Sequence, residues 1–313
     1  MSGSGFLDRI VPWHGVLRYC AAVLLFGLLF WVVDPNELLA TLLRADALLV
    51  AALCGVAVVW LFLGALNVWV LLRCRSTIPL LSFTEVYVMS WSMGLLIPGQ
   101  LGDATQILLL RRHSVAVASS AAAYTVDKII SLCTLGLIGA YGVARFSIAV
   151  SPITALAVSA TAAILFACAI FLVIKLVPGF RLLQRVREFL KSISTEIAFF
   201  RVRPDLISLN ALISIVKWLV MAHMYYTVFA ALSVAISFES AATIPVVSSL
   251  VAYIPITVSG IGTTEWTAVG LFRTVGIAPF DVVGAYLVMR AVLISCAAAM
   301  LIVGRLSRRA RSH

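Results

Sequence analysis

The sequence MGLLIPGQLGDATQILLLRR, from Met93 to Arg112, holds two apolar runs separated by a short break. The first run ends at Pro98, which lacks a backbone N–H and biases the residue before it away from a helix. Gly99 and Gly102 follow, and glycine permits backbone angles that other residues resist. At membrane depth, an interrupted helix has to be buried in protein or line a wet cavity. If the surrounding chain is membrane-embedded, this break is the first place to expect a binding site.

The composition is that of a membrane protein. Of the 313 residues, 63% are hydrophobic and only 12% are charged. Several apolar segments exceed the ~18 residues that a membrane-spanning helix needs. These segments occur throughout the chain, so we predict one all-α, polytopic membrane domain over residues 1–313.

The net charge of +10 does not indicate a nucleic-acid partner. The arginines cluster at the ends of apolar runs, which is typical of residues that set membrane topology and contact anionic lipid headgroups. The six cysteines lie mostly inside apolar runs without a CxxC pair, and the four histidines are scattered. We therefore expect no metal site and no cofactor.

About six segments are long enough to cross the bilayer as helices. The expected spans are Val16–Val33, Leu48–Leu72, Ala116–Tyr141, Ile153–Val177, Leu206–Leu232 and Val282–Val303. A basic, amphipathic segment, residues 178–203, is expected to lie as a helix at the cytoplasmic membrane–water interface.

The opening stretch is too short to supply two further spans. Its first arm is Leu80–Ile97, and its second, Asp103–Leu110, has eight residues that cover only ~12 Å of a ~30 Å apolar core. The arms are therefore expected to form a re-entrant hairpin. The pattern recurs where Ala241–Val258 and Glu265–Val275 flank the sequence SGIGTT. The expected hinge residues are Pro98, Gly99 and Gly102 in the first hairpin and Pro255, Gly260 and Gly262 in the second.

The distribution of basic residues predicts the topology. A cytoplasmic N-terminus places 17 of the 23 lysines and arginines on the inner side, as the positive-inside rule favours. The two hairpins then open from opposite sides, and residues 15–145 and 152–304 form inverted repeats. Inverted repeats with paired broken helices are typical of alternating-access transporters. We expect both termini to be cytoplasmic, in the inner membrane of a prokaryote.

An acidic residue lies just beyond each break. Asp103 occupies an expected N-cap position with Gln106 three residues on, and Glu265 falls in the first turn after a cap at Thr263 or Thr264. Free N–H groups at such helix starts attract anions such as phosphate. Two interpretations stay open for each acid: it contacts substrate, or it only caps its helix.

Three cations lie inside apolar runs: Lys128, Lys217 and Arg290. Each unpaired charge at the bilayer centre costs roughly 2.5–3.5 kcal/mol, so these side chains need partners, unless Lys217 snorkels to the interface. The available anions are Asp103, Asp127 and Glu265. The candidate substrate-binding residues are Gln100, Asp103, Asp127, Lys128, Lys217, Glu265 and Arg290.

These motifs resemble a known family. The stretches IPGQLGDATQILLLRR (97–112) and IPITVSGIGTTEW (254–266), the pair Asp127-Lys128 and Arg290 are similar to the flippase-like membrane domain of lysylphosphatidylglycerol synthetases and its free-standing relatives. That family typically has Arg where Lys128 stands, so the charge is kept but bidentate phosphate geometry is lost. The resemblance covers nearly the whole chain and implies a lipid-translocating protein with two inverted re-entrant hairpins. Only about ten polar residues follow the last span, so lipid aminoacylation is not expected.

The leading functional prediction is a flippase, rather than an enzyme, for an anionic phospholipid or a polyprenyl-phosphate-linked or related lipid. Its cavity would lie between the two hairpins. The alternatives are a membrane-embedded enzyme acting on a lipid phosphate or glycan, and an accessory subunit of a glycosyltransferase. A homo-oligomer and a lipid-modifying enzyme partner both stay open, and no nucleic-acid partner is expected.

Overall fold

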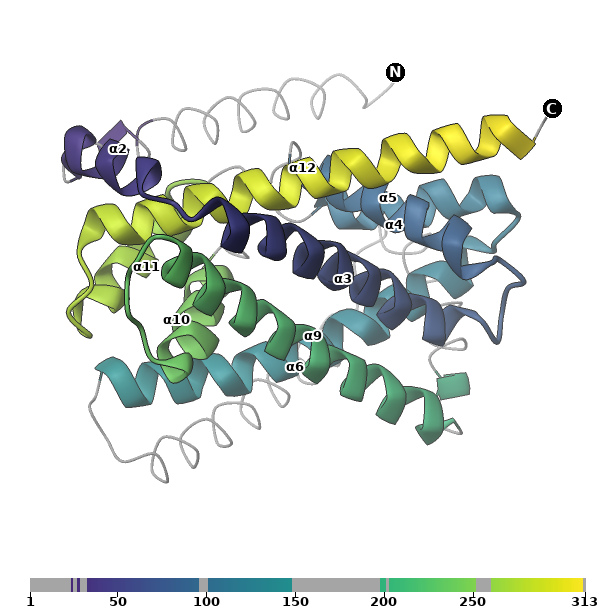
Figure 1. Cartoon of the computed structure of the whole chain (residues 1–313). Helices are drawn as coiled ribbons and strands as arrows, with labels where there is room; N and C mark the ends of the chain where they lie inside the picture. Colours follow the sequence, from purple (N-terminus) through teal and green to yellow (C-terminus); the bar gives the residue numbers. More distant parts are fainter. Residues whose placement is uncertain are drawn as a thin grey trace, which may run out of the picture.

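A computed structural model describes residues 33–95, 101–147, 198–200, 203–251 and 260–311, together with residues 24, 27 and 28. Every regular element in these ranges is helical (Figure 1). Most of the predicted first span, the predicted span 153–177 and most of the interfacial segment 178–203 lie outside the described residues.

Four of the described helices are long and apolar enough to cross a membrane, and four shorter helices form two pairs. The long helices are α3 (Ala47–Leu72), α6 (Val117–Ser147), α9 (Pro204–Ala231) and α12 (Pro279–Arg311). The short helices that follow them in two pairs are α4 (Leu80–Gly94), α5 (Leu101–Leu110), α10 (Phe238–Val251) and α11 (Thr263–Arg273). Large apolar side chains on the outer surface of the bundle are exposed, as expected of a multi-pass membrane protein.

The predicted connection between the first two spans contains a short helix, α2 (Pro35–Leu43). Asp34 caps it by accepting a hydrogen bond from the Asn36 N–H at 2.8 Å, and proline occupies its first position. The helix packs against α12, where the Thr41 hydroxyl donates to Asp281 at 3.3 Å. The lengths of apolar runs do not reveal α2, because its nine residues are too few to cross a membrane.

The helices α3 and α9 form an antiparallel pair at the centre of the bundle (Figure 1). The Asp46 N–H, just before α3, donates to the Ala231 carbonyl at the end of α9 at 2.9 Å. At the other end, the Asn210 side chain donates to the Asn67 carbonyl at 2.8 Å. The start of each helix therefore lies beside the end of the other.

The two short-helix pairs enter the bundle from opposite ends. The helix α4 packs on α5, and α10 packs on α11. The first pair follows the end of α3 and the second follows the end of α9, and these two ends are opposite because α3 and α9 are antiparallel. Each short helix covers only about 15–22 Å at 1.5 Å per residue, which is less than the ~30 Å of an apolar membrane core.

The helices correspond between the two halves of the chain. The series α3, α4, α5 and α6 has 26, 15, 10 and 31 residues, and α9, α10, α11 and α12 have 28, 14, 11 and 33. The contacts correspond as well: α4 packs on α12 as α10 packs on α6, and α5 packs on α6 as α11 packs on α12. Each long final helix therefore contacts the first short helix of the other half.

Glycines allow close approach in both of these crossed contacts. On α6, a Cβ added at Gly142 would lie 3.1 Å from the Thr243 Cβ of α10. On α12, a Cβ added at Gly304 would lie 2.8 Å from the Glu85 Oε1 of α4. Small residues are typical of helix interfaces inside membranes, because they let two backbones pack closely.

Candidate functional site

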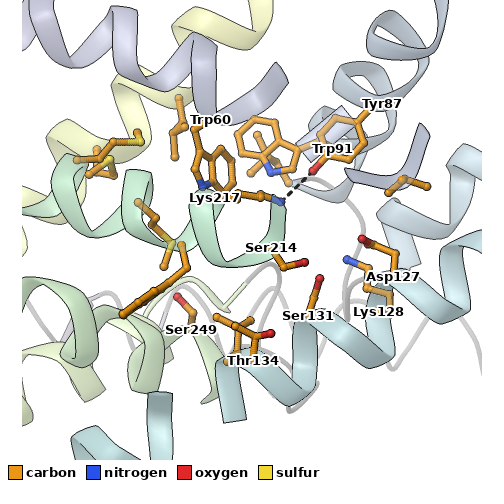
Figure 2. A pocket seen from close by; sticks show the side chains of 18 of the residues that line it. Trp60, Tyr87, Trp91, Asp127, Lys128, Ser131, Thr134, Ser214, Lys217 and Ser249 are labelled. Atoms are coloured by element: carbon orange, nitrogen blue, oxygen red, sulfur yellow. Dashed lines mark hydrogen bonds between the residues drawn. The ribbon is translucent and has the colours of Figure 1, made fainter. Parts of the chain in front are cut away.

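A cavity of about 350 Å³ lies between the long and short helices, and all three intramembrane cations line it. Lys128 comes from α6, Lys217 from α9 and Arg290 from α12. Asp127 also lines the cavity (Figure 2). The fold therefore brings together four of the predicted site residues, which are spread over more than 160 positions of the sequence.

Arg290 is paired with Glu265. Its Nε and a terminal nitrogen lie 2.8 and 2.7 Å from the Glu265 Oε1. The carboxylate is only 1% exposed, and its other oxygen accepts a hydrogen bond from the Gly262 N–H at 2.8 Å. Glu265 thus closes the first turn of α11 and neutralises Arg290 at the same time.

The cap of α11 is Gly262, and not Thr263 or Thr264 as predicted. Its φ is +87°, a backbone angle that favours glycine. The Thr263 hydroxyl instead donates to the Gly260 carbonyl at 3.0 Å, so it stabilises the turn before the helix.

Lys217 lies midway along α9, and its ammonium points into the cavity (Figure 2). It lies 3.3 Å from the Tyr87 hydroxyl and 4.8 Å from the centre of the Trp60 ring. Among the described side chains, no carboxylate forms an ion pair with it. Its charge is therefore stabilised by aromatic faces and a hydroxyl group.

The contact between Lys217 and Tyr87 depends on a glycine in α3. A Cβ at Gly64 would collide with the Tyr87 hydroxyl group, so only glycine leaves room for this tyrosine between α3 and α4. Trp91, one helical turn after Tyr87, packs edge-on against Trp60 with ring centres 6.3 Å apart. The sequence predicted neither Trp60 nor Tyr87 as a site residue.

Asp127 is buried in a polar network that joins α3, α6 and α9. Its Oδ1 accepts hydrogen bonds from the side-chain amides of Asn67 at 2.7 Å and Asn210 at 3.1 Å. The Asn67 amide also donates to the Ser214 hydroxyl at 3.0 Å. Neither asparagine was predicted from the sequence as a site residue. Each has an amide side chain inside an apolar span, and burying such a group in a membrane costs free energy unless another side chain forms a hydrogen bond with it. This feature could have identified both residues.

Lys128 follows Asp127 in α6, and its ammonium lies 5.4 Å from the centre of the Tyr124 ring. Both side chains line the cavity. Trp91 and Trp218 line it too. The Trp218 indole N–H donates to the Ala242 carbonyl at 2.9 Å, which fixes this ring between α9 and α10.

The first hairpin tip is only partly described. Pro98, Gly99 and Gln100, together with Pro255 of the second predicted hairpin, lie outside the described residues, and Gly102 and Asp103 are described by their backbone alone. The backbone of α5 begins at Leu101, two residues before the predicted start. Asp103 is therefore the third residue of α5, and its predicted place as the N-cap is wrong. Glu265 is likewise the third residue of α11.

The cavity-lining residues of α6 and α12 stand at the same positions of their helices. Positions 8, 11, 12 and 15, counted from the first residue of each helix, line the cavity in both. The residues are Tyr124, Asp127, Lys128 and Ser131 on α6 and Tyr286, Met289, Arg290 and Leu293 on α12.

Among the described residues, the lining carries three cationic side chains and one carboxylate. Glu265 lies behind this lining and compensates Arg290. Charges interact strongly where water and its high dielectric constant are excluded. A cavity of this composition is suited to binding an anionic group.

No curated protein matches the chain. Residues 16–300 match the model of the family described as "Lysylphosphatidylglycerol synthase TM region", so the chain belongs to this family of lipid-related membrane domains.

Proposed function

We propose that this protein moves an anionic lipid headgroup across the cytoplasmic membrane through the cavity between its two short-helix pairs. The observation that carries the proposal is Lys217, a cation midway along a membrane-spanning helix that points into the cavity without an ion-pair partner among the described side chains. An uncompensated charge at the bilayer centre costs roughly 2.5–3.5 kcal/mol. An anionic headgroup in the cavity would offset that cost.

Arg290 supplies a second contact, which a headgroup gains by competing with Glu265. A phosphate beside the guanidinium group replaces a carboxylate with another anion, so Arg290 stays compensated, while the buried Glu265 carboxylate needs a proton to offset its own charge. Because Glu265 also accepts a hydrogen bond from Gly262, this exchange acts on the first turn of α11. Binding can shift a conformational equilibrium only if the two states differ in affinity for the ligand, and this exchange provides such a difference.

The correspondence between the two halves supports an inverted repeat with two re-entrant hairpins. Matched helix lengths, matched contacts and entry from opposite ends are what such a repeat requires. In transporters of this kind, substrate binds near the bilayer midplane and the two sides open in turn. We place the N- and C-termini on the cytoplasmic side, as the distribution of lysine and arginine favours.

Reconstitution into liposomes tests the proposal. Fluorescent phosphatidylglycerol in the inner leaflet is protected from an external reductant, and a flippase exposes it without changing its mass. We expect Lys217→Gln to slow the movement of lipid between leaflets (lipid exchange) by about tenfold, because one charge-assisted contact is lost. Lys217→Arg should retain lipid exchange. Arg273→Gln, which alters an exposed cation at the end of α11, is the matched control.

Two results would contradict the proposal. A wild-type rate of lipid exchange in a folded Lys217→Gln variant would show that the cavity is not part of the transport route. A change in the mass of the lipid would indicate an enzyme instead.

A further inference from the structure

The walls of the cavity differ in chemistry. Figure 2 shows Trp60, Tyr87 and Trp91 on one side and hydroxyl groups on the other. The labelled hydroxyl groups on that side belong to Ser131 and Thr134 of α6, Ser214 of α9 and Ser249 of α10, and all four residues line the cavity. A site for phosphate alone would need only hydrogen-bond donors, because phosphate oxygens are acceptors.

The hydroxyl wall offers acceptors as well as donors. The Thr134 hydroxyl donates to the Ile130 carbonyl of its own helix at 2.9 Å, so it presents lone pairs to a ligand. Asp127 adds a carboxylate to this side of the cavity. Ser131 and Ser249 form no hydrogen bonds within the described part of the chain, and each can donate and accept. The complement to such a wall is a ligand with hydroxyl groups of its own.

The aromatic wall suits the same kind of ligand. The faces of aromatic rings carry partial negative charge, and they attract the C–H bonds of a sugar or cyclitol ring, which are polarised by neighbouring oxygens. The volume of about 350 Å³ is within the ~300–1,000 Å³ that is typical of sites enclosing a whole small molecule. It therefore has room for a ring beside a phosphate group.

The opposite long helix indicates where the apolar part of a lipid would lie. At the positions where α6 carries Asp127 and Ser131, α12 carries Met289 and Leu293. The next residue, Ile294, lines the cavity and is also 50% exposed on the molecular surface. An acyl chain leaving the cavity beside α12 would stay in apolar surroundings.

We infer that the headgroup is a phosphate joined to a hydroxylated ring, a cyclitol or a sugar. Its phosphate lies toward Lys217 and Arg290, and its hydroxyl groups face Ser131, Thr134 and Ser249. This inference rests on the proposed function for its phosphate contact, and it adds the chemical class of the group attached to that phosphate.

Calorimetric titration of the full-length protein in detergent tests the inference without requiring transport. The probes are inositol 1-phosphate and inorganic phosphate. We expect inositol 1-phosphate to bind about tenfold more tightly, as two additional hydrogen bonds would give. The double variant Ser131→Ala/Thr134→Val should lose this preference and keep its affinity for inorganic phosphate.

Thr125→Val is the matched control, because Thr125 also donates to a carbonyl of α6 but does not line the cavity. It should leave both affinities unchanged. Equal affinities of the wild-type protein for the two probes would overturn the inference, as would an equal loss of both in the double variant.

The liposome assay separates this inference from the proposed function. Phosphatidylinositol should exchange several-fold faster than phosphatidic acid with the same acyl chains. If phosphatidic acid is exchanged as fast, the inference of a hydroxylated ring fails while the flippase proposal stands. If neither lipid changes leaflet but inositol 1-phosphate still binds preferentially, the inferred class of headgroup stands and the flippase proposal fails.

Discussion

The two halves of the bundle share an arrangement of helices but neutralise their buried charges differently. In the second half, Arg290 of α12 is paired with Glu265 at the start of α11. In the first half, Asp127 of α6 accepts hydrogen bonds from two asparagines on α3 and α9. Corresponding backbones can therefore surround the cavity with unlike chemistry. The difference places hydroxyl groups and a carboxylate on α6 and apolar side chains at the same positions of α12.

The largest effect is expected at the ion pair. Glu265→Gln can still accept the hydrogen bond from Gly262, but it leaves the Arg290 charge without its partner. Removing one member of a buried ion pair typically costs about 3–5 kcal/mol. We expect a marked fall in the thermal unfolding temperature in detergent. Glu239→Gln, at the more exposed pair with Arg145, is the control and should change the unfolding temperature little. Equal stability of the two variants would mean that the burial of Glu265 has no energetic consequence.

The amide network should contribute less than the ion pair. Asn67→Ala removes donors to Asp127 and Ser214, and Asn210→Ala removes a donor to Asp127. A hydrogen bond to a charged group contributes about 1.5–3 kcal/mol, so each variant should be destabilised by about that amount in the same unfolding measurement. A larger loss of stability than that caused by Glu265→Gln would mean that the amide network stabilises the bundle more than the ion pair does.

An exchange of cations tests how far the halves are interchangeable. Lys128 and Arg290 are both the twelfth residue of their helices. Arg290→Lys loses one of the two N–H contacts to Glu265, so we expect about tenfold slower lipid exchange. Lys128→Arg keeps the positive charge and should change the rate less than about twofold. The opposite order of effects would show that α6, and not α12, holds the critical cation.

The smallest effect is expected where α6 meets α10. Tyr141→Phe removes a hydrogen bond to Glu239 of 2.7 Å in a half-exposed position. We expect a loss of about 0.5–1 kcal/mol in stability. Tyr124→Phe, on the same helix, is the comparison for lipid exchange because it lines the cavity. A larger loss of lipid exchange from Tyr141→Phe than from Tyr124→Phe would show that the contact between α6 and α10 matters more for transport than the cavity does.

The sequence was sufficient for features that depend on local pattern. Apolar length identified α3, α9 and the starts of the paired short helices within about three residues, and charges inside apolar runs identified Lys128, Lys217 and Arg290 as cavity residues. The start of α5 was placed two residues late, because a helix end is set by cap geometry that the glycine-containing break leaves open.

The partners of the cations were harder to predict. Lys217 contacts Tyr87 and Trp60, and these residues are brought together only by the packing of three helices. Tyr87 and Trp60 are ordinary membrane residues in the sequence, and nothing in their spacing distinguishes them from lipid-facing aromatics. Glu265, by contrast, was proposed as a partner because few carboxylates were available.

The glycine contacts at Gly142 and Gly304 have a consequence for motion. Inside a bilayer, lipid tails solvate an apolar helix surface about as well as a neighbouring helix does. The apolar part of the seam at each glycine therefore separates at little cost. The two seams also hold carboxylates, Glu85 beside Gly304 and Glu239 beside Tyr141, and a charged group exposed to lipid is costly. The crossed contacts between the two halves therefore resist separation at these carboxylates and not along the apolar surface between them.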